Sequence, residues 1–136
     1  MRAVNLIAVL FLIGCGAQPQ EKVPSLEEVA KLEQVVDTSL PLVQQAYSIE
    51  TQEVCERQGG SWKKIGRQQS FGCVLPTADA GNVCNDSREC EVACIVDDND
   101  IKAGEEVQGV CLNNTDLLGC RSYVSNGVVE QTLCVD

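Results

Sequence analysis

The sequence predicts a small disulfide-rich α+β fold, with N-terminal helices followed by short β-hairpins stapled by four disulfides. Three observations predict it. Nine cysteines occur in 136 residues, and all except Cys15 lie within residues 55–136. Aromatic side chains make up only 4% of the chain, so cross-links must supply stability that a small core does not. Helix-type spacing of apolar residues is confined to residues 25–54, and turn signals interrupt the rest.

The N-terminus has the pattern of an export signal. Arg2 precedes an apolar run that ends at Ile13, and small residues follow. The run is shorter than the ~20 apolar residues that cross a bilayer. The tetrad Leu12-Ile13-Gly14-Cys15 resembles the lipobox of bacterial lipoprotein precursors. This resemblance implies a signal peptide over residues 1–14, cleavage before Cys15 and a diacylglycerol group on the Cys15 sulfur.

The residues after Cys15 indicate where the mature protein resides. Gly16 stands where inner-membrane lipoproteins of Gram-negative bacteria carry Asp, so the pattern resembles that of outer-membrane lipoproteins. Residues 15–24, interrupted by two prolines, are expected to form a tether between membrane and domain. The alternative is cleavage after Ala17, which releases a soluble secreted or periplasmic protein. Both routes place the remaining cysteines in an oxidising compartment.

Residues 25–54 are predicted to be helical. Ser25 and Glu28 form a capping box, and apolar residues at three- and four-residue steps predict a helix to about Asp37. Pro41, preceded by Ser39 as a cap, predicts a second helix that runs on toward Val54 and ends at Gly59-Gly60. The segment is expected to pack on the cysteine-rich part or to act as a stalk. A partner-binding helical hairpin is the alternative.

Two hairpins are predicted after the helices. The strands Ser61–Ile65 and Phe71–Leu75 should pair around Gly66, with Trp62 facing Phe71, and so bring Cys55 near Cys73. Asn126-Gly127 is a strong hairpin turn signal. Strict pairing from that turn sets Cys120 opposite Leu133, and a one-residue bulge sets it opposite Cys134. We therefore expect a Cys120–Cys134 disulfide.

The remaining four cysteines are expected to form the pairs Cys84–Cys94 and Cys90–Cys111, one of many possible sets. Zinc is the competing interpretation of such a cluster. The chain contains no Cys-x-x-Cys and no histidine, both of which structural zinc sites favour. We therefore expect neither a metal nor another cofactor, and the same spacing disfavours a thioredoxin-like redox role.

The cysteine-rich part carries two resemblances. The stretch from Cys55 through Gly59-Gly60 and Trp62 to Cys73 resembles a segment of small exported bacterial domains. Residues 79–94 resemble the Cys-rich segment of a group of proteobacterial lipoproteins with no assigned function. The pattern of that group continues through Gly109-Val110-Cys111 and Gly119-Cys120 to Cys134-Val135-Asp136. The likeness covers residues 55–136 and implies no active site.

The amino-acid composition limits which classes of function the chain can have. The absence of histidine excludes Ser-His and Cys-His nucleophile pairs, and the net charge of −10 argues against nucleic acid. Asp97–Asp100 fails as an EF-hand because Ile101 and Lys102 occupy the fifth and sixth positions, so a solvated loop tip is expected. The predicted function is that of a lipid-anchored, non-enzymatic binding or structural module with a protein or cation partner. The alternative is an inhibitor of a secreted hydrolase, a lysozyme or a protease, acting through residues 95–110.

Overall fold

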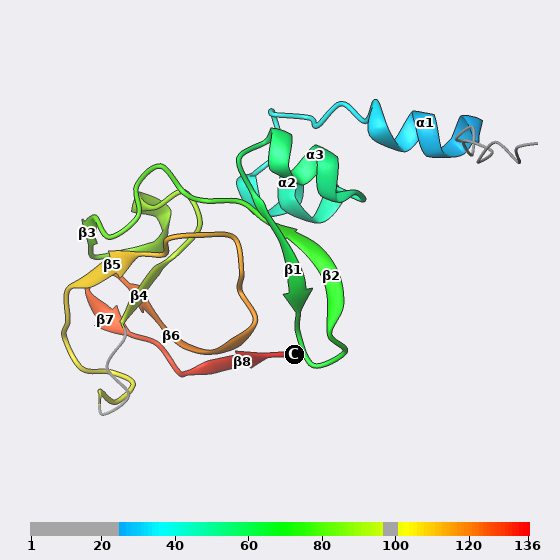
Figure 1. Cartoon of the computed structure of the whole chain (residues 1–136). Helices are drawn as coiled ribbons and strands as arrows, with labels where there is room; N and C mark the ends of the chain where they lie inside the picture. Colours follow the sequence, from blue (N-terminus) through cyan, green and yellow to red (C-terminus); the bar gives the residue numbers. More distant parts are fainter. Residues whose placement is uncertain (1–24, 97–100) are drawn as a thin grey trace, which may run out of the picture.

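The computed structural model describes residues 25–96 and 101–136. It is small and disulfide-rich, with short helices and two mostly antiparallel sheets (Figure 1). The described part therefore contains more β-structure, and less helix, than the sequence predicts. The signal peptide, Cys15, the tether and Asp97–Asp100 lie outside the described residues.

The predicted helical segment consists of three short helices, α1 (Leu26–Leu32), α2 (Leu42–Ser48) and α3 (Gln52–Arg57). The expected extents were wrong. The first helix ends before Asp37, and Pro41 lies in extended backbone ahead of α2 rather than in its first turn. The second helix breaks because Ile49 turns into the core and the Thr51 hydroxyl accepts a hydrogen bond from the backbone N–H of Val54, which starts α3.

The first lobe, residues 34–75, packs α2 and α3 against a hairpin. Strands β1 (Ser61–Ile65) and β2 (Ser70–Val74) pair antiparallel, with Trp62 opposite Cys73. The turn that was predicted near Gly66 is present, and Gly66 has a positive φ of 67°. The core of this lobe contains the following buried residues: Val36, Ala46, Ile49, Val54, Cys55, Cys73 and Leu75. In Figure 1, α1 projects away from this lobe.

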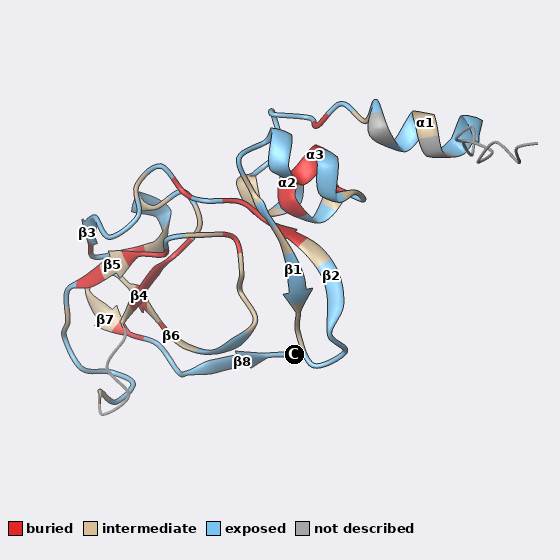
Figure 2. Ribbon diagram, viewed as in Figure 1, coloured by how far each residue is buried: buried red, intermediate tan, exposed pale blue. Residues whose placement is uncertain are grey.

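The second lobe, residues 76–136, contains a six-stranded antiparallel sheet. Its strands are β3 (Val83–Cys84), β4 (Cys94–Val96), β5 (Gly109–Cys111), β6 (Gly119–Ser125), β7 (Val128–Val129) and β8 (Leu133–Val135). The sheet order is β3-β5-β4-β6-β7, and β8 also pairs with β6. A 3-10 turn, η1 (Ser87–Glu89), covers one end. Figure 2 shows that burial concentrates in β4, β5 and the middle of β6.

The C-terminal hairpin contains the predicted bulge. Ser125 lies opposite Val128 next to the turn, whereas Cys120 lies opposite Cys134 at the far end. The returning strand must therefore hold one extra residue between β7 and β8. Asn126 and Gly127 both have positive φ, 52° and 75°, which is the backbone of a type I′ turn.

The described chain contains four disulfides, and each of them joins two cysteines of the same lobe. They join Cys55 to Cys73, Cys84 to Cys94, Cys90 to Cys111 and Cys120 to Cys134. These are the pairs expected from the sequence. The two middle bridges interleave along the chain and replace much of the apolar core, since Cys84, Cys94 and Cys111 pack around Val124.

A polar seam joins the lobes. The Thr115 hydroxyl accepts a hydrogen bond from the backbone N–H of Leu75 at 3.0 Å, and the Thr115 N–H donates to the Leu75 carbonyl at 3.0 Å. Next to these bonds, and within the second lobe, the Thr77 hydroxyl donates to the Leu112 carbonyl at 2.6 Å. Thr77 and Thr115 are buried, so these bonds replace water that neither residue can reach.

Candidate binding surface

One face of the β1–β2 hairpin carries Phe71, which like Tyr47 in α2 is an aromatic side chain of the first lobe that is 60% exposed. Residues opposite each other in the register, and residues two apart in a strand, share a face. Trp62, Lys64, Phe71 and Cys73 therefore share one, which we call the hairpin face. Cys73 is bonded to Cys55 in α3, so the helix covers that end. Phe71 lies beyond the helix and is 60% exposed.

The hairpin face is ordered by ring contacts. The Trp62 and Phe71 rings are stacked with 6° between their planes and 6.4 Å between centroids. The Lys64 ammonium lies 5.7 Å from the Phe71 centroid, within cation–π range. The predicted facing of Trp62 and Phe71 is confirmed. Because Trp62 is half-buried against the first core, it holds the Phe71 ring out from the fold without burying it.

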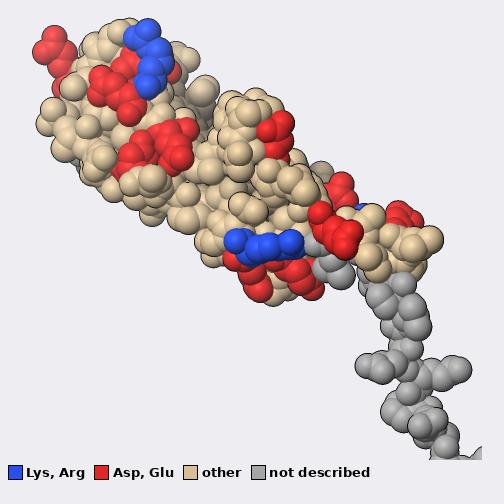
Figure 3. Space-filling model, turned by 90° about the horizontal axis from the view of Figure 1, so that it is seen from above, with Lys and Arg blue, Asp and Glu red and all other residues tan. Residues whose placement is uncertain are grey.

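The same hairpin concentrates positive charge in an acidic chain. Arg57, Lys63, Lys64 and Arg67 lie in a stretch that contains no Asp or Glu between Glu56 and Asp79. The space-filling view of Figure 3, seen from above relative to Figure 1, shows several clusters of acidic side chains and few basic ones. The acid-free stretch is visible in the sequence, but its link to an exposed aromatic face needs the hairpin register.

The opposite face of the hairpin borders a hollow between the lobes. The hollow is open, has a volume of about 440 Å³ and is lined by residues of the β1–β2 turn together with Leu118 and Asp136. Two ion pairs bridge the lobes there, Lys63 to Asp116 at 3.1 Å and Arg67 to Asp136 at 3.4 Å. Lys63 and Arg67 are therefore each paired with a carboxylate on this side of the hairpin. Lys64 therefore carries the charge of the hairpin face.

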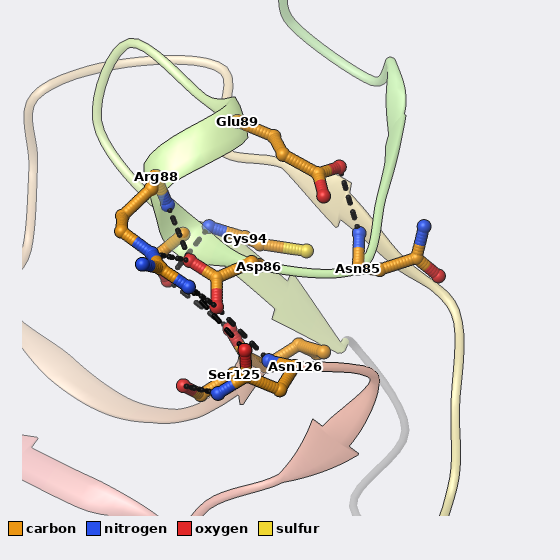
Figure 4. A network of polar contacts seen from close by, with 9 residues as sticks. Asn85, Asp86, Arg88, Glu89, Cys94, Ser125 and Asn126 are labelled. Carbon is orange, nitrogen blue, oxygen red and sulfur yellow. Dashed lines mark hydrogen bonds and ion pairs between the residues drawn. The ribbon is translucent and has the colours of Figure 1, made fainter.

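A second polar cluster holds the tip of the C-terminal hairpin (Figure 4). The buried Asp86 carboxylate accepts hydrogen bonds from the backbone N–H and the guanidinium of Arg88, at 2.9, 2.8 and 3.1 Å. It also accepts one from the backbone N–H of Asn126 at 2.9 Å. The Arg88 side chain and these donors hold the pKa of Asp86 far below its ordinary value. The ion pair orders η1, and the hydrogen bonds of Asp86 and Arg88 to Asn126 anchor it to the β6–β7 turn, which is a structural role.

The cysteine clusters do not form a thiolate metal site in the described residues. Two groups have ligand atoms within 4.8 Å of one another, Cys84 with Cys90 and Cys94, and Asp79 with Cys90 and Cys111. Every cysteine in these groups belongs to a disulfide. A disulfide sulfur is not a thiolate, and metal binding by cysteine requires the thiolate.

The loop expected to carry an inhibitory segment is described only in part. Asp97–Asp100 lies outside the described residues, whereas residues 104–107 run along β7. Gly104 and Val107 donate backbone hydrogen bonds to Val129 and Gly127, and Val129 donates one to Glu105 at 2.9 Å. This part of the loop is therefore fixed against the hairpin rather than free at a tip. Glu105 and Glu106 remain exposed on it.

Comparison of the chain with protein-family models, with curated proteins and with solved structures finds no match. Across residues 25–96 and 101–136, no helix has the length and apolar character needed to cross a bilayer.

Proposed function

We propose that this chain is a lipid-anchored, non-enzymatic binding module of the bacterial cell envelope, and that the hairpin face contacts a protein partner. The lipobox-like tetrad ending at Cys15 supports the anchor, and Gly16 favours the outer membrane. The single observation that supports the binding surface is the exposed Phe71 ring, which is stacked on Trp62 beside Lys64.

A protein partner fits this surface better than a nucleic acid or a bilayer. Aromatic anchors beside cationic groups are enriched at protein interfaces, and truncating such an anchor removes about 2 kcal/mol or more of binding energy. The net charge of −10 repels polyanions. At physiological salt that repulsion is screened over about 8 Å, so Lys64 still favours an acidic patch on a partner.

The test compares two exposed apolar side chains in opposite lobes. Phe71 is 60% exposed and Val83, on β3, is 62% exposed. The full-length chain and its Phe71→Ser and Val83→Ser variants are used to capture proteins from outer-membrane extracts. We expect the Phe71→Ser variant to capture at least one of these proteins in an amount about tenfold or more lower than the unmodified chain does. Val83→Ser should keep it. Identical captured sets for all three proteins would refute the role of the hairpin face.

The anchor is tested separately. Mass spectrometry of the protein purified from a Gram-negative host should show Cys15 as the N-terminal residue with acyl chains attached. One chain binds a membrane only marginally, so two or more are expected. Cys15→Ser should move the protein to the soluble fraction. An intact leader, or cleavage after Ala17, would contradict the lipid anchor without bearing on the hairpin face.

A second candidate function is inhibition of a secreted hydrolase. The segment 104–107, which is hydrogen-bonded to the C-terminal hairpin, favours it, because an inhibitor needs a preorganised segment and this one presents two acidic residues, Glu105 and Glu106. Lysozymes are basic, so they are the first enzymes to assay. Unchanged lysozyme and protease activity at micromolar concentrations of the protein would exclude this function.

A further inference from the structure

The four disulfides differ in their exposure to solvent. Cys120 and Cys134 are both exposed. In the Cys55–Cys73 and Cys84–Cys94 bridges both cysteines are 4% exposed or less. In the Cys90–Cys111 bridge this holds for Cys111. Thiol–disulfide exchange needs a thiolate to approach a sulfur directly, so a buried bridge reacts only after the fold opens locally.

The exposed Cys120–Cys134 bridge fixes strand β8, which makes few other contacts. All three residues of β8 are exposed, and within the described residues β8 pairs only with β6. Neither Leu133 nor Val135 belongs to a core cluster. Past β8, the side chain of Asp136 forms an exposed ion pair with Arg67. Cleaving the Cys120–Cys134 bond therefore removes the main constraint on the segment after the bulge.

We propose that Cys120–Cys134 is a reducible site at which an external dithiol exchanges with this protein while the other three bridges stay intact. A thiolate of the dithiol attacks one of the two sulfurs, and the Cys–Cys bond breaks as a mixed disulfide forms. The other cysteine leaves as a thiolate and takes a proton from water. The second thiol of the reductant then displaces the remaining cysteine and closes the reductant's own disulfide. Two electrons pass from the dithiol to the protein.

Reduction of this disulfide would also change the lining of the hollow between the lobes. Asp136 lines this hollow, and Val135 and Asp136 together line an adjoining one that shares Gly66 and Leu118 with it. Release of β8 withdraws this lining and separates Asp136 from Arg67. Lys64 of the hairpin face also lines the adjoining hollow, but the proposal rests on the exposure of the Cys120–Cys134 bridge and not on the partner surface.

Dithiothreitol is the probe for the test. The native full-length protein is incubated with it, quenched with an alkylating reagent at several times and mapped by mass spectrometry. We expect Cys120 and Cys134 to be alkylated about tenfold or more faster than the other six paired cysteines, because their bond is reached without opening the fold. In guanidinium chloride the difference should disappear. Faster alkylation of any other pair in the native protein, or equal rates for all four, would overturn the proposal.

A second measurement follows the released strand. In the selectively reduced protein, amide hydrogen exchange should accelerate at residues 133–135 and stay slow in β4. The double variant C120S/C134S should show the same exchange pattern without any reductant and should lose the fast-alkylating pair. Unchanged exchange at residues 133–135 in the reduced protein would refute the release of β8.

Discussion

The seam between the lobes gives a sharp prediction for Thr115. The Thr115 hydroxyl is the acceptor for the Leu75 N–H at 3.0 Å, and both residues are only 3% exposed. Thr115→Val keeps the shape of the side chain but removes this acceptor. The second bond of the pair, from the Thr115 N–H to the Leu75 carbonyl, involves backbone atoms and persists. The substitution therefore isolates one buried donor that is left without a partner.

The expected magnitude follows from that isolation. A buried N–H that loses its acceptor destabilises a fold by about 1–3 kcal/mol. For a domain of roughly 100 residues, this lowers Tm by roughly 5 °C per kcal/mol. With a urea m-value of about 2 kcal/mol/M, the unfolding midpoint falls by about 1 M.

The assay is urea unfolding without reductant, so that all four disulfides remain. Trp62 is the only tryptophan, and its fluorescence reports on the first lobe, while far-UV circular dichroism reports on both. The control is Thr38→Val, because Thr38 is exposed and only its backbone carbonyl forms a hydrogen bond, accepted from Gln45. A midpoint for Thr115→Val no lower than that of Thr38→Val would refute the role given to the seam.

Three further predictions concern positions held by close contact, charge or backbone conformation. Gly60→Ala should destabilise the protein by about 1–3 kcal/mol, because an added Cβ would lie 2.8 Å from the Cys55 sulfur and 2.9 Å from the Cys73 sulfur; thermal unfolding that matches wild type would contradict it. The pKa of Asp86 is lower in the folded state than its ordinary value of 3.8, so its stabilisation is complete above that pH and is lost as the pH falls further. Acid titration of stability should show this loss in wild type and a smaller one in Asp86→Asn, and parallel curves would contradict it. Asn126→Ala should cost about 1 kcal/mol, because φ is positive there; the turn is mispredicted if urea unfolding shows no change.

The parts of the fold governed by local rules could be predicted from the sequence. Asn126-Gly127 fixes a turn type, the turn fixes the register, and the register requires a bulge if Cys120 is to meet Cys134. The hairpin from Ser61 follows the same logic, since Gly66 supplies the positive φ that its turn needs.

The helical segment was harder to predict because tertiary burial overrode its spacing. Ile49 fits a continuing helix by sequence, but it is drawn into the first core, and the chain restarts at Thr51. A Thr followed by Gln and Glu is a cap signal that would have marked this break. The joining of β3, β4 and β5 into one sheet rests on contacts far apart in sequence, which local patterns do not encode.

The candidate surface was only partly accessible from the sequence. The pairing of Trp62 with Phe71 follows from the hairpin, whereas the exposure of Phe71 depends on how far α3 reaches over β2. That reach is fixed by the Cys55–Cys73 bond and by the close fit of Gly60, which are properties of the packed structure.

The four bridges of the described chain also divide at the seam. One closes within residues 55–73 and three within residues 84–134, so none spans the connection near Pro76. A single peptide-bond cleavage at the exposed Ala78 would therefore leave two fragments that share no covalent link. They would part in denaturant alone, and each half can be produced and studied as an autonomous folding candidate.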